Sequence, residues 1–204
     1  MGDAAPALLT YRDYLDVEQH TGVKHEFHDG DVCAMAGGTR AHARLVLRVG
    51  SALDIALAGR ECVAYGSELR VRIPERNKAY YADASVVCGA AESAPDDANA
   101  VVNPTVLVEV LSASTEAFDR GEKFDDYATL PSLKEYVLVS ATRPLVEVYR
   151  RDGSGTWSSQ RYGPGTTVEL RATDVRFPVE RLYEGVELDA PPLRRRIRIV
   201  EEGG

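Results

Sequence analysis

Thr105-Val-Leu-Val-Glu-Val-Leu111 is the stretch of sequence that decides the fold. Its short length and β-branched residues favour a strand buried on both faces over a helix. One charge, Glu109, interrupts the run, and it shares a side with two leucines while the valines point the other way. Because an unpaired buried ion is costly, Glu109 should meet a metal ion, a cationic side chain or water in a cleft. A structural salt bridge, or a position at the open end of the strand, is the alternative.

The residues after this strand predict a helix over about residues 120–130. Asp119 and Glu122 form a capping-box pattern at its start, and Pro131 ends it. Lys123 lies in the first turns, from which it could return to the carboxyl end of the Glu109 strand. There an ammonium group would orient an attacking water or stabilise charge on a phosphate. Taken alone, Lys123 also fits an ordinary surface lysine.

A second carboxylate, Asp83, lies inside the strand candidate of residues 80–88. Two carboxylates on neighbouring strands can hold a hard divalent cation, since Mg²⁺ takes one or two protein carboxylates together with waters and substrate phosphate. Such a metal polarises phosphate and activates water. If residues 80–82 belong to a loop, Asp83 is instead a solvated charge.

The remaining elements predict a mixed α/β fold. Residues 41–58 carry apolar side chains at helical spacing and stop at Gly59, which predicts a long amphipathic helix. The order of long helix, two or three strands, helix and strand then suggests helices packed on a sheet. We further expect a capped helix after Thr10, a hairpin turning at Asp29-Gly30, a surface loop at 89–103, strands at 61–65, 68–73, 135–140, 145–150, 156–162 and 166–170, and a short helix near 179–183.

The composition and length of the chain argue against several classes of protein, including membrane proteins and disulfide-rich secreted proteins. The chain has 204 residues, a formal charge of −8 and three cysteines, Cys33, Cys62 and Cys88. This length favours one domain, and nothing in the sequence resembles a membrane span or a signal peptide. The odd number and wide spacing of the cysteines predict no disulfide framework and no zinc site, so the default is a soluble protein of a reducing cytoplasm. The acidic excess argues against broad electrostatic attachment to nucleic acid.

An ordered series of motifs resembles the Uma family of predicted restriction endonucleases, within the PD-(D/E)XK nuclease superfamily. The resemblance spans about residues 8–188, which we take as one domain, followed by a Pro- and Arg-containing tail at 189–204. The series is more specific than any one of its pieces. Its members are His25-Glu-Phe-His-Asp-Gly30, Tyr65-Gly-Ser-Glu-Leu-Arg-Val71, Ala82-Asp-Ala-Ser-Val-Val87, and Val108-Glu-Val-Leu-Ser112 leading to Asp119-Arg-Gly-Glu-Lys-Phe124.

The resemblance implies a restriction-endonuclease-like αβββαβ core, a mixed central sheet flanked by helices, with an extra N-terminal hairpin and extra C-terminal strands. It implies Asp83 and Glu109 as metal ligands and Glu26, in the early hairpin, as a third carboxylate; an exposed hairpin charge is the alternative for Glu26. Ala82 replaces the usual motif proline, which is not a ligand. Leu111 stands where the superfamily has a lysine, and Lys123 is the replacement that we expect.

Several other polar residues have two interpretations. His42 matches a family histidine at the start of the long helix but also fits a packed core residue, whereas His25 and His28 are expected at the surface. Arg70 and Arg72 could contact phosphate or pair with acids. In the tail, Arg194-Arg-Arg196 and Arg198 could touch nucleic acid or form a solvated end.

The expected function is a Mg²⁺- or Mn²⁺-dependent endonuclease that cleaves DNA. Asp83 and Glu109 would hold the metal, Glu26 would assist and Lys123 would position the water. A homodimer is expected for cutting two strands, with no membrane partner. A nuclease-like scaffold that binds protein or nucleic acid without cutting is the first alternative, and a sugar hydrolase with a carboxylate pair is a weaker one.

Overall fold

The computed structural model describes residues 8–190 of the chain. Its strands form two six-stranded sheets and one small two-stranded sheet. The helices are α1 (Tyr11–Thr21), α2 (Arg40–Leu57), α3 (Glu116–Arg120), α4 (Glu122–Tyr127) and α5 (Val179–Tyr183), with a 3-10 turn at Pro74–Arg76. The strands are β1 (His25–His28), β2 (Asp31–Ala34), β3 (Cys62–Gly66), β4 (Arg70–Ile73), β5 (Lys78–Tyr81), β6 (Ala84–Cys88), β7 (Ser93–Ala94), β8 (Asp97–Val101), β9 (Val106–Leu111), β10 (Glu135–Ser140), β11 (Val146–Arg151), β12 (Trp157–Tyr162), β13 (Thr167–Leu170) and β14 (Val175–Pro178).

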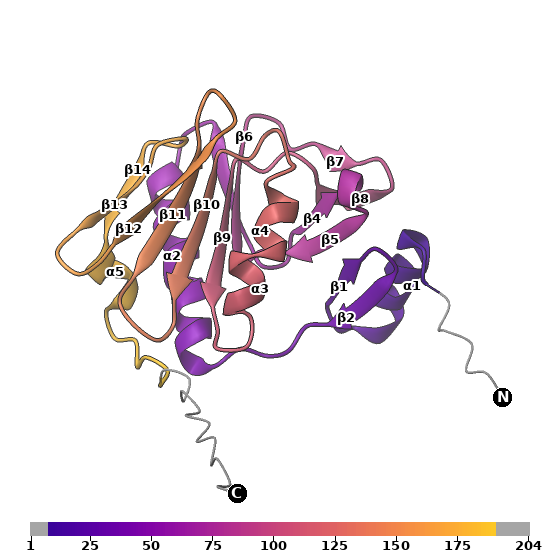
Figure 1. Cartoon of the computed structure of the whole chain (residues 1–204), viewed down its shortest axis with the longest axis horizontal. Helices are drawn as coiled ribbons and strands as arrows, with labels where there is room; N and C mark the ends of the chain where they lie inside the picture. Colours follow the sequence, from indigo (N-terminus) through magenta and orange to yellow (C-terminus); the bar gives the residue numbers. More distant parts are fainter. Residues whose placement is uncertain (1–7, 191–204) are drawn as a thin grey trace, which may run out of the picture.

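One sheet, ordered β12-β11-β10-β9-β6-β3, carries the predicted core. Helix α2 covers one of its faces, and α3 and α4 cover the other (Figure 1). Along the chain, α2, β3, β6, β9, the α3–α4 pair and β10 follow the αβββαβ order, with β9 and β10 parallel. The expected restriction-endonuclease-like mixed α/β architecture is therefore confirmed.

Strand β9 lies at the centre of this sheet, between β6 and β10. All six of its residues are buried. Val106, Val108 and Val110 pack into the cluster that includes α2, whereas Leu107 and Leu111 pack into the cluster that includes α4. The alternation expected from the sequence is confirmed, and it places Glu109 on the side of α3 and α4.

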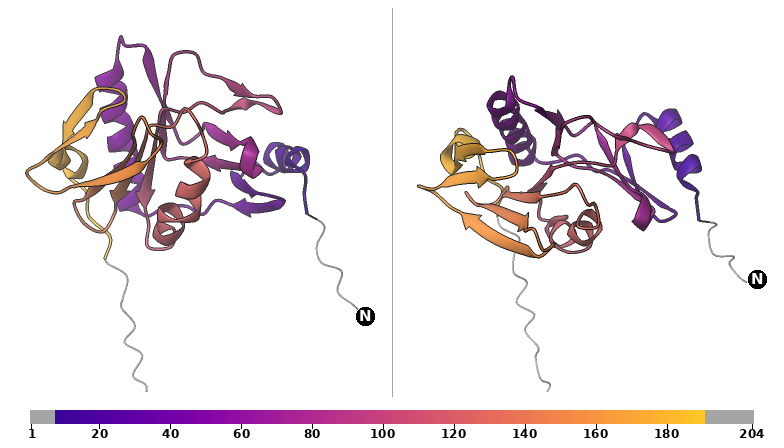
Figure 2. Two further views of the ribbon diagram at one scale, coloured as in Figure 1. Left: turned by 45° about the horizontal axis from the view of Figure 1, so that its top comes forward. Right: turned by 90° about the horizontal axis from the view of Figure 1, so that it is seen from above.

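The second sheet, ordered β2-β1-β5-β4-β8-β7, extends the molecule beside the core sheet (Figure 2). Helix α1 packs on it through Tyr11 and Tyr14, whose rings contact Phe27 of β1. The chain passes from this sheet to the core sheet between β5 and β6, and Asp83 lies at that crossing.

Several local predictions agree with the structure. Thr10 and Asp13 form the capping box of α1. The Asp29-Gly30 turn has the positive φ angles that a type I′ turn requires, 50° and 108°. It joins β1 to β2 in the expected register, with Glu26 opposite Cys33.

Other predictions were wrong. The single helix expected at 120–130 is two short helices that break at Gly121, so Asp119 lies within α3 and is not a cap. The strand expected at 80–88 belongs to two strands, β5 and β6. The loop expected at 89–103 contains β7 and β8, which pair with each other and lengthen the second sheet.

The prediction for the cysteines was also wrong, because Cys62 and Cys88 are joined by a disulfide. Their large separation along the chain hides the fact that β3 and β6 are antiparallel neighbours in which these two residues face each other. The arginines of the predicted tail lie outside the described residues. Within residues 8–190, no helix is long and apolar enough to cross a membrane.

Candidate active site

Asp83 and Glu109 lie side by side at the end of the β6–β9 pair. Ala84 pairs with Val108, so one step further along the ladder Asp83, which directly precedes β6, comes next to Glu109. The Asp83 Oδ2 atom accepts a hydrogen bond of 2.7 Å from the Val110 backbone N–H. The antiparallel register thus brings together two carboxylates that are 26 positions apart in the sequence.

Lys123 reaches this pair from the first turn of α4. Its Nζ atom lies 3.0 Å from Glu109 Oε1, 3.0 Å from Glu26 Oε1 and 3.9 Å from Asp119 Oδ1. Burial alone would lower the pKa of Lys123, but the three carboxylates outweigh burial and raise that pKa. Lys123 is therefore a buried ammonium group at the site, and the interpretation as a surface lysine was wrong.

Glu26 comes from the far end of the chain through the β1–β2 hairpin. Strand β1 pairs with β5, and this pairing places Glu26 of β1 close to α4. Burial tends to raise the pKa of Glu26, but the Lys123 ammonium and His28 outweigh it and keep the pKa below its usual range. Glu26 thus lies at the cluster rather than on an exposed hairpin.

Asp119 and Tyr127 are site residues that the sequence interpretation missed. Asp119 is buried, and burial raises its pKa. The Tyr127 hydroxyl donates a hydrogen bond of 3.2 Å to Glu109 Oε1. A signal for Asp119 was present, because Asp119 and Lys123 are spaced i, i+4 and would share one side of a helix.

His42 is the cationic candidate on the opposite side of the site. Thr39 caps the start of α2, and His42 Nε2 lies 3.4 Å from Asp83 Oδ2. The hydrogen bond to Asp83 raises the pKa of His42 above its usual value. His42 is therefore a neighbour of the Asp83 carboxylate, not a residue of the apolar core.

Apart from Tyr127, the residues described above line one cavity of about 630 Å³. Five carboxylates, namely the four described above and Asp189, share it with one lysine and one histidine, so negative charge is in excess. Burial raises the pKa of Glu109 well above its usual range, and the neighbouring carboxylates add to the shift while Lys123 opposes it. We call this set the site cluster: Glu26, His42, Asp83, Glu109, Asp119 and Lys123.

The site cluster fits a divalent metal ion in its donor chemistry. Over the described part of the chain, no three His, Cys, Asp or Glu side chains are arranged as a ready-made metal centre. Mg²⁺, however, needs only one or two protein carboxylates, with water and phosphate as its other ligands. Asp83 and Glu109 supply that pair beside an open cavity, and the excess of carboxylates is the electrostatic condition that a cation would relieve.

Of the other polar residues, the two arginines lie away from the site cluster, whereas His28 borders it, with its Nε2 atom 3.6 Å from Glu26 Oε2. Arg70 binds Glu18 and Asp97, and Arg72 binds Asp96, so both arginines pair with acids. The expectation of surface histidines was wrong. His28 packs against the rings of Tyr80 and Phe118, and His25 contacts Glu18.

Comparisons with known proteins place the chain in a family. The family model Uma2, described as "Putative restriction endonuclease", matches residues 11–180. An uncharacterized protein of Synechocystis sp. is 34% identical over 181 residues, 87% of this chain and 93% of that protein. A second uncharacterized Synechocystis protein is 32% identical over 154 residues, 76% of this chain and 87% of that protein.

A solved structure shares the fold. The crystal structure described as that of a "putative nuclease belonging to DUF820" from Anabaena variabilis aligns with a TM-score of 0.70 and 16% identity, covering 86% of this chain and 97% of that one. At this identity the match concerns the fold alone. The family model, by contrast, covers most of the chain, from α1 into α5. The chain belongs to the Uma2 family of putative restriction endonucleases.

Proposed function

We propose that this protein is a metal-dependent endonuclease that hydrolyses phosphodiester bonds of DNA. The observation that carries the proposal is the convergence of the four carboxylates of the site cluster and Lys123, from separate elements, in one cavity. Membership of a family described as restriction endonucleases supports a nuclease in general. The metal, the residue roles and DNA as the substrate are our own inference.

Asp83 and Glu109 would hold Mg²⁺ or Mn²⁺. When bound, such an ion polarises the scissile phosphate and lowers the pKa of water. The fixed geometry of the two carboxylates supports this role: the Val110 N–H orients Asp83, and the Tyr127 hydroxyl orients Glu109. Each carboxylate is thus held by a rigid part of the core before any ligand arrives.

Lys123 would stabilise the developing charge on phosphate and orient the attacking water. Its ammonium is already desolvated and fixed by Glu26 and Glu109, so little reorganisation is needed when substrate binds. Glu26 keeps Lys123 charged and positioned. His42, on the other side of Asp83, would face the same phosphate and is placed to exchange a proton there.

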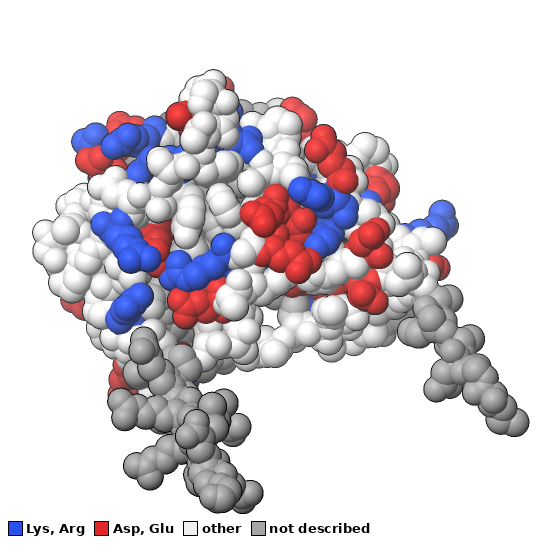
Figure 3. Space-filling view, viewed as in Figure 1, with Lys and Arg blue, Asp and Glu red and all other residues white. Residues whose placement is uncertain are grey.

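The outer surface implies that DNA binding is weak and depends on salt. Acidic and basic side chains lie next to one another over the face seen in Figure 3, without one continuous basic patch. The chain as a whole carries a formal charge of −8. Because attraction to the phosphate backbone depends on Lys and Arg, we expect cleavage to fall as salt is added.

One observation favours a second candidate, a nuclease-like scaffold that binds without cutting. Lys123 already lies within 3.0 Å of Glu109 and partly neutralises it without a metal. If that ion pair persists in solution, the Oε1 atom of Glu109 is already occupied by Lys123 and Tyr127. A measurement of metal binding therefore distinguishes the endonuclease from the non-cutting scaffold more directly than a measurement of DNA cleavage does.

The test uses supercoiled plasmid DNA with Mg²⁺ or Mn²⁺, together with calorimetric titration of each metal. Asp83→Asn and Glu109→Gln keep the shape of the side chain while removing its charge. We expect both variants to lose metal-dependent cleavage and most metal affinity while remaining folded. Glu147→Gln is the matched control, because Glu147 is equally buried but bound to Arg120 and Arg161 outside the cavity.

The outcomes separate the candidates. Undiminished cleavage by the Asp83→Asn/Glu109→Gln double variant would refute the proposed site. Wild-type protein that shows no metal binding dependent on these two residues, and no cleavage, would favour the scaffold. Equal loss in Glu147→Gln would mean that the loss reflects stability and not the site.

A further inference from the structure

Two adjacent glycines, Gly37 and Gly38, lie in the segment that joins β2 to α2 (Figure 1). Both line the cavity that contains the site cluster. Neither has a positive φ angle, so backbone conformation alone does not require glycine at either position. The surroundings of the two glycines differ. A Cβ atom added at Gly37 would meet nothing within 4 Å, whereas one added at Gly38 would lie 2.6 Å from His42 Nδ1.

The His42 ring lies directly against the backbone of Gly38. The added Cβ atom would also lie 2.9 Å from His42 Cγ and 3.2 Å from His42 Cβ, so the close contacts involve the base of the side chain. Non-bonded carbon atoms prefer a separation of about 3.5–4.0 Å. The His42 backbone N–H is held by the Thr39 side chain at the start of α2. A side chain at position 38 would therefore make the His42 ring rotate away.

The other ring nitrogen of His42 lies near Asp83. His42 Nε2 is 3.4 Å from Asp83 Oδ2, the oxygen that also accepts the hydrogen bond of the Val110 N–H. A neutral imidazole that carries its proton on Nε2 can donate it to this oxygen. Among residues 8–190, no hydrogen bond or ion pair reaches the second oxygen, Oδ1. Asp83 is thus held through one oxygen, and the other is left for a ligand.

We propose that Gly38 is a positioning residue of the candidate active site. The absence of a side chain at position 38 allows the His42 ring to lie where its Nε2 atom orients Asp83 as a metal ligand. Gly38 has no side-chain group of its own, so it acts through His42. The effect on metal binding rests on the proposed function, whereas the contact between Gly38 and His42 does not depend on it.

The first test compares Gly38→Ala with Gly37→Ala by calorimetric titration with Mn²⁺. The two variants add the same methyl group at neighbouring positions that line one cavity, and only the first meets His42. Groups that hydrogen-bond a metal ligand usually change metal affinity about 10- to 100-fold, so Gly38→Ala should lower it about tenfold and Gly37→Ala should change it less than about twofold. The titration is made at about pH 8.5, where imidazole is ordinarily neutral, so that loss of a positive charge does not offset the loss of orientation.

A double-mutant cycle tests whether Gly38 acts through His42. His42→Ala removes the ring, so a methyl group at position 38 has nothing left to displace. We expect His42→Ala to bind Mn²⁺ about as weakly as Gly38→Ala, and the double variant to bind no more weakly than His42→Ala. A purely structural role of Gly38 would not depend on His42 in this way. A second loss of about tenfold in the double variant would overturn the proposal.

Crystal structures without metal separate this inference from the proposed function. In Gly38→Ala, His42 Nε2 should lie beyond hydrogen-bonding distance of Asp83, whereas it should stay close in wild-type protein and in Gly37→Ala. If wild-type protein binds no Mn²⁺, the proposed function fails, and these structures still decide whether Gly38 places His42 beside Asp83. If wild-type protein binds Mn²⁺ but Gly38→Ala keeps the ring in place or keeps full affinity, the inference fails and the proposed function stands.

Discussion

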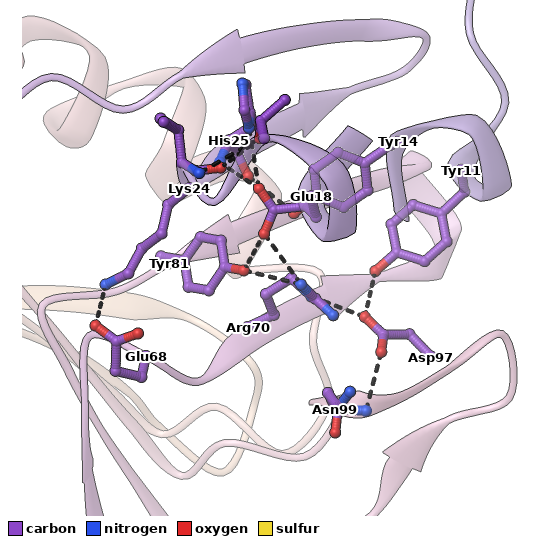
Figure 4. Close-up of polar contacts among 12 residues, drawn as sticks. Tyr11, Tyr14, Glu18, Lys24, His25, Glu68, Arg70, Tyr81, Asp97 and Asn99 are labelled. Atoms are coloured by element: carbon purple, nitrogen blue, oxygen red, sulfur yellow. Dashed lines mark hydrogen bonds and ion pairs between the residues drawn. The ribbon is translucent and has the colours of Figure 1, made fainter. Parts of the chain in front are cut away.

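Two clusters of buried charge lie on the two sheets and differ in how their carboxylates are satisfied. The first, which we call the Arg70 cluster, consists of Arg70, Glu18, Asp97, Tyr81 and Tyr11 (Figure 4). Glu18 accepts hydrogen bonds from Arg70, Tyr81 and the backbone of residue 25, and Asp97 accepts from Arg70, Tyr11 and the backbone of residue 99. In this cluster both oxygens of each carboxylate have donors.

In the site cluster, by contrast, the carboxylates outnumber the donors that contact them. The contacts of Glu109 within residues 8–190 all reach Oε1, from Lys123 and Tyr127. Burial acts to raise the pKa values of Asp97, Glu109 and Asp119. The donors around Asp97 outweigh burial and lower its pKa, whereas the pKa values of Glu109 and Asp119 remain raised. The Arg70 cluster, in which every carboxylate oxygen has a donor, is suited to stabilise the fold. The site cluster, which has an excess of negative charge beside a cavity, is suited to bind a cation.

The largest effect should come from breaking the Arg70 cluster. Arg70→Met leaves Glu18 and Asp97, whose side chains are only 9% and 4% exposed, without their common cation. We expect the free energy of unfolding to fall by about 3–5 kcal/mol, the usual result of removing one partner of a buried ion pair. Urea denaturation monitored by circular dichroism measures this change. A loss below about 1 kcal/mol would show that the cluster is solvated in solution.

A smaller effect is expected from the matching substitution in the site cluster, Lys123→Met. Here the remaining carboxylates open onto a cavity of about 630 Å³, where water can hydrate them. We expect a loss of about 1–3 kcal/mol, less than for Arg70→Met, because hydration offsets part of the missing ion pair.

Divalent metal should separate the two variants further. Added Mn²⁺ should stabilise Lys123→Met at least as much as wild-type protein, because a ligand that binds only the folded state raises its stability. It should leave the deficit of Arg70→Met, relative to wild-type protein, unchanged. The midpoints of thermal unfolding with and without Mn²⁺ provide the measurement. If Mn²⁺ reduced the deficit of Arg70→Met, the contrast between the clusters would be wrong.

The core sheet could be predicted from the sequence because local pattern and burial agree there. The run from residue 105 to 111 is apolar on both sides, and β9 is buried on both sides. The α3–α4 region could not be predicted in the same way. Phe124 and Tyr127 give a helical pattern only after Gly121, so it does not predict α3, the separate short helix before Gly121 from which Asp119 lines the cavity.

The candidate site was predictable only in part, because its geometry depends on contacts far apart in the chain. Glu109 stood out as one charge in an apolar strand. Nothing local indicates that Glu26 lies 3.0 Å from Lys123, 97 positions away, since that contact depends on β1 pairing with β5. The disulfide was missed for the same reason: only the β3–β6 register places Cys62 opposite Cys88.

The smallest predicted effect concerns the pH dependence of the Arg70 cluster. Burial would raise the pKa of Asp97, but Arg70, the residue 99 N–H and Tyr11 outweigh it, so its pKa in the folded state lies below its value in the unfolded chain. Between these two values the unfolded state binds more protons, so stability rises with pH. The contribution of Asp97 is therefore complete above the unfolded pKa of about 3.9 and is lost as pH falls through the folded value.

Asp97→Asn tests this sign directly. The difference in free energy of unfolding between wild-type protein and Asp97→Asn should be largest near neutral pH and should shrink as the solution is acidified below about pH 4. Comparing two proteins at each pH cancels the titration of the carboxylates that they share, including those of the site cluster. In an Arg70→Met background the part of this difference that depends on pH should be smaller, because the group that lowers the pKa of Asp97 most is gone. A difference that stays constant with pH would mean that Arg70 and Asp97 do not interact in solution, and the two clusters would then differ in geometry but not in electrostatics.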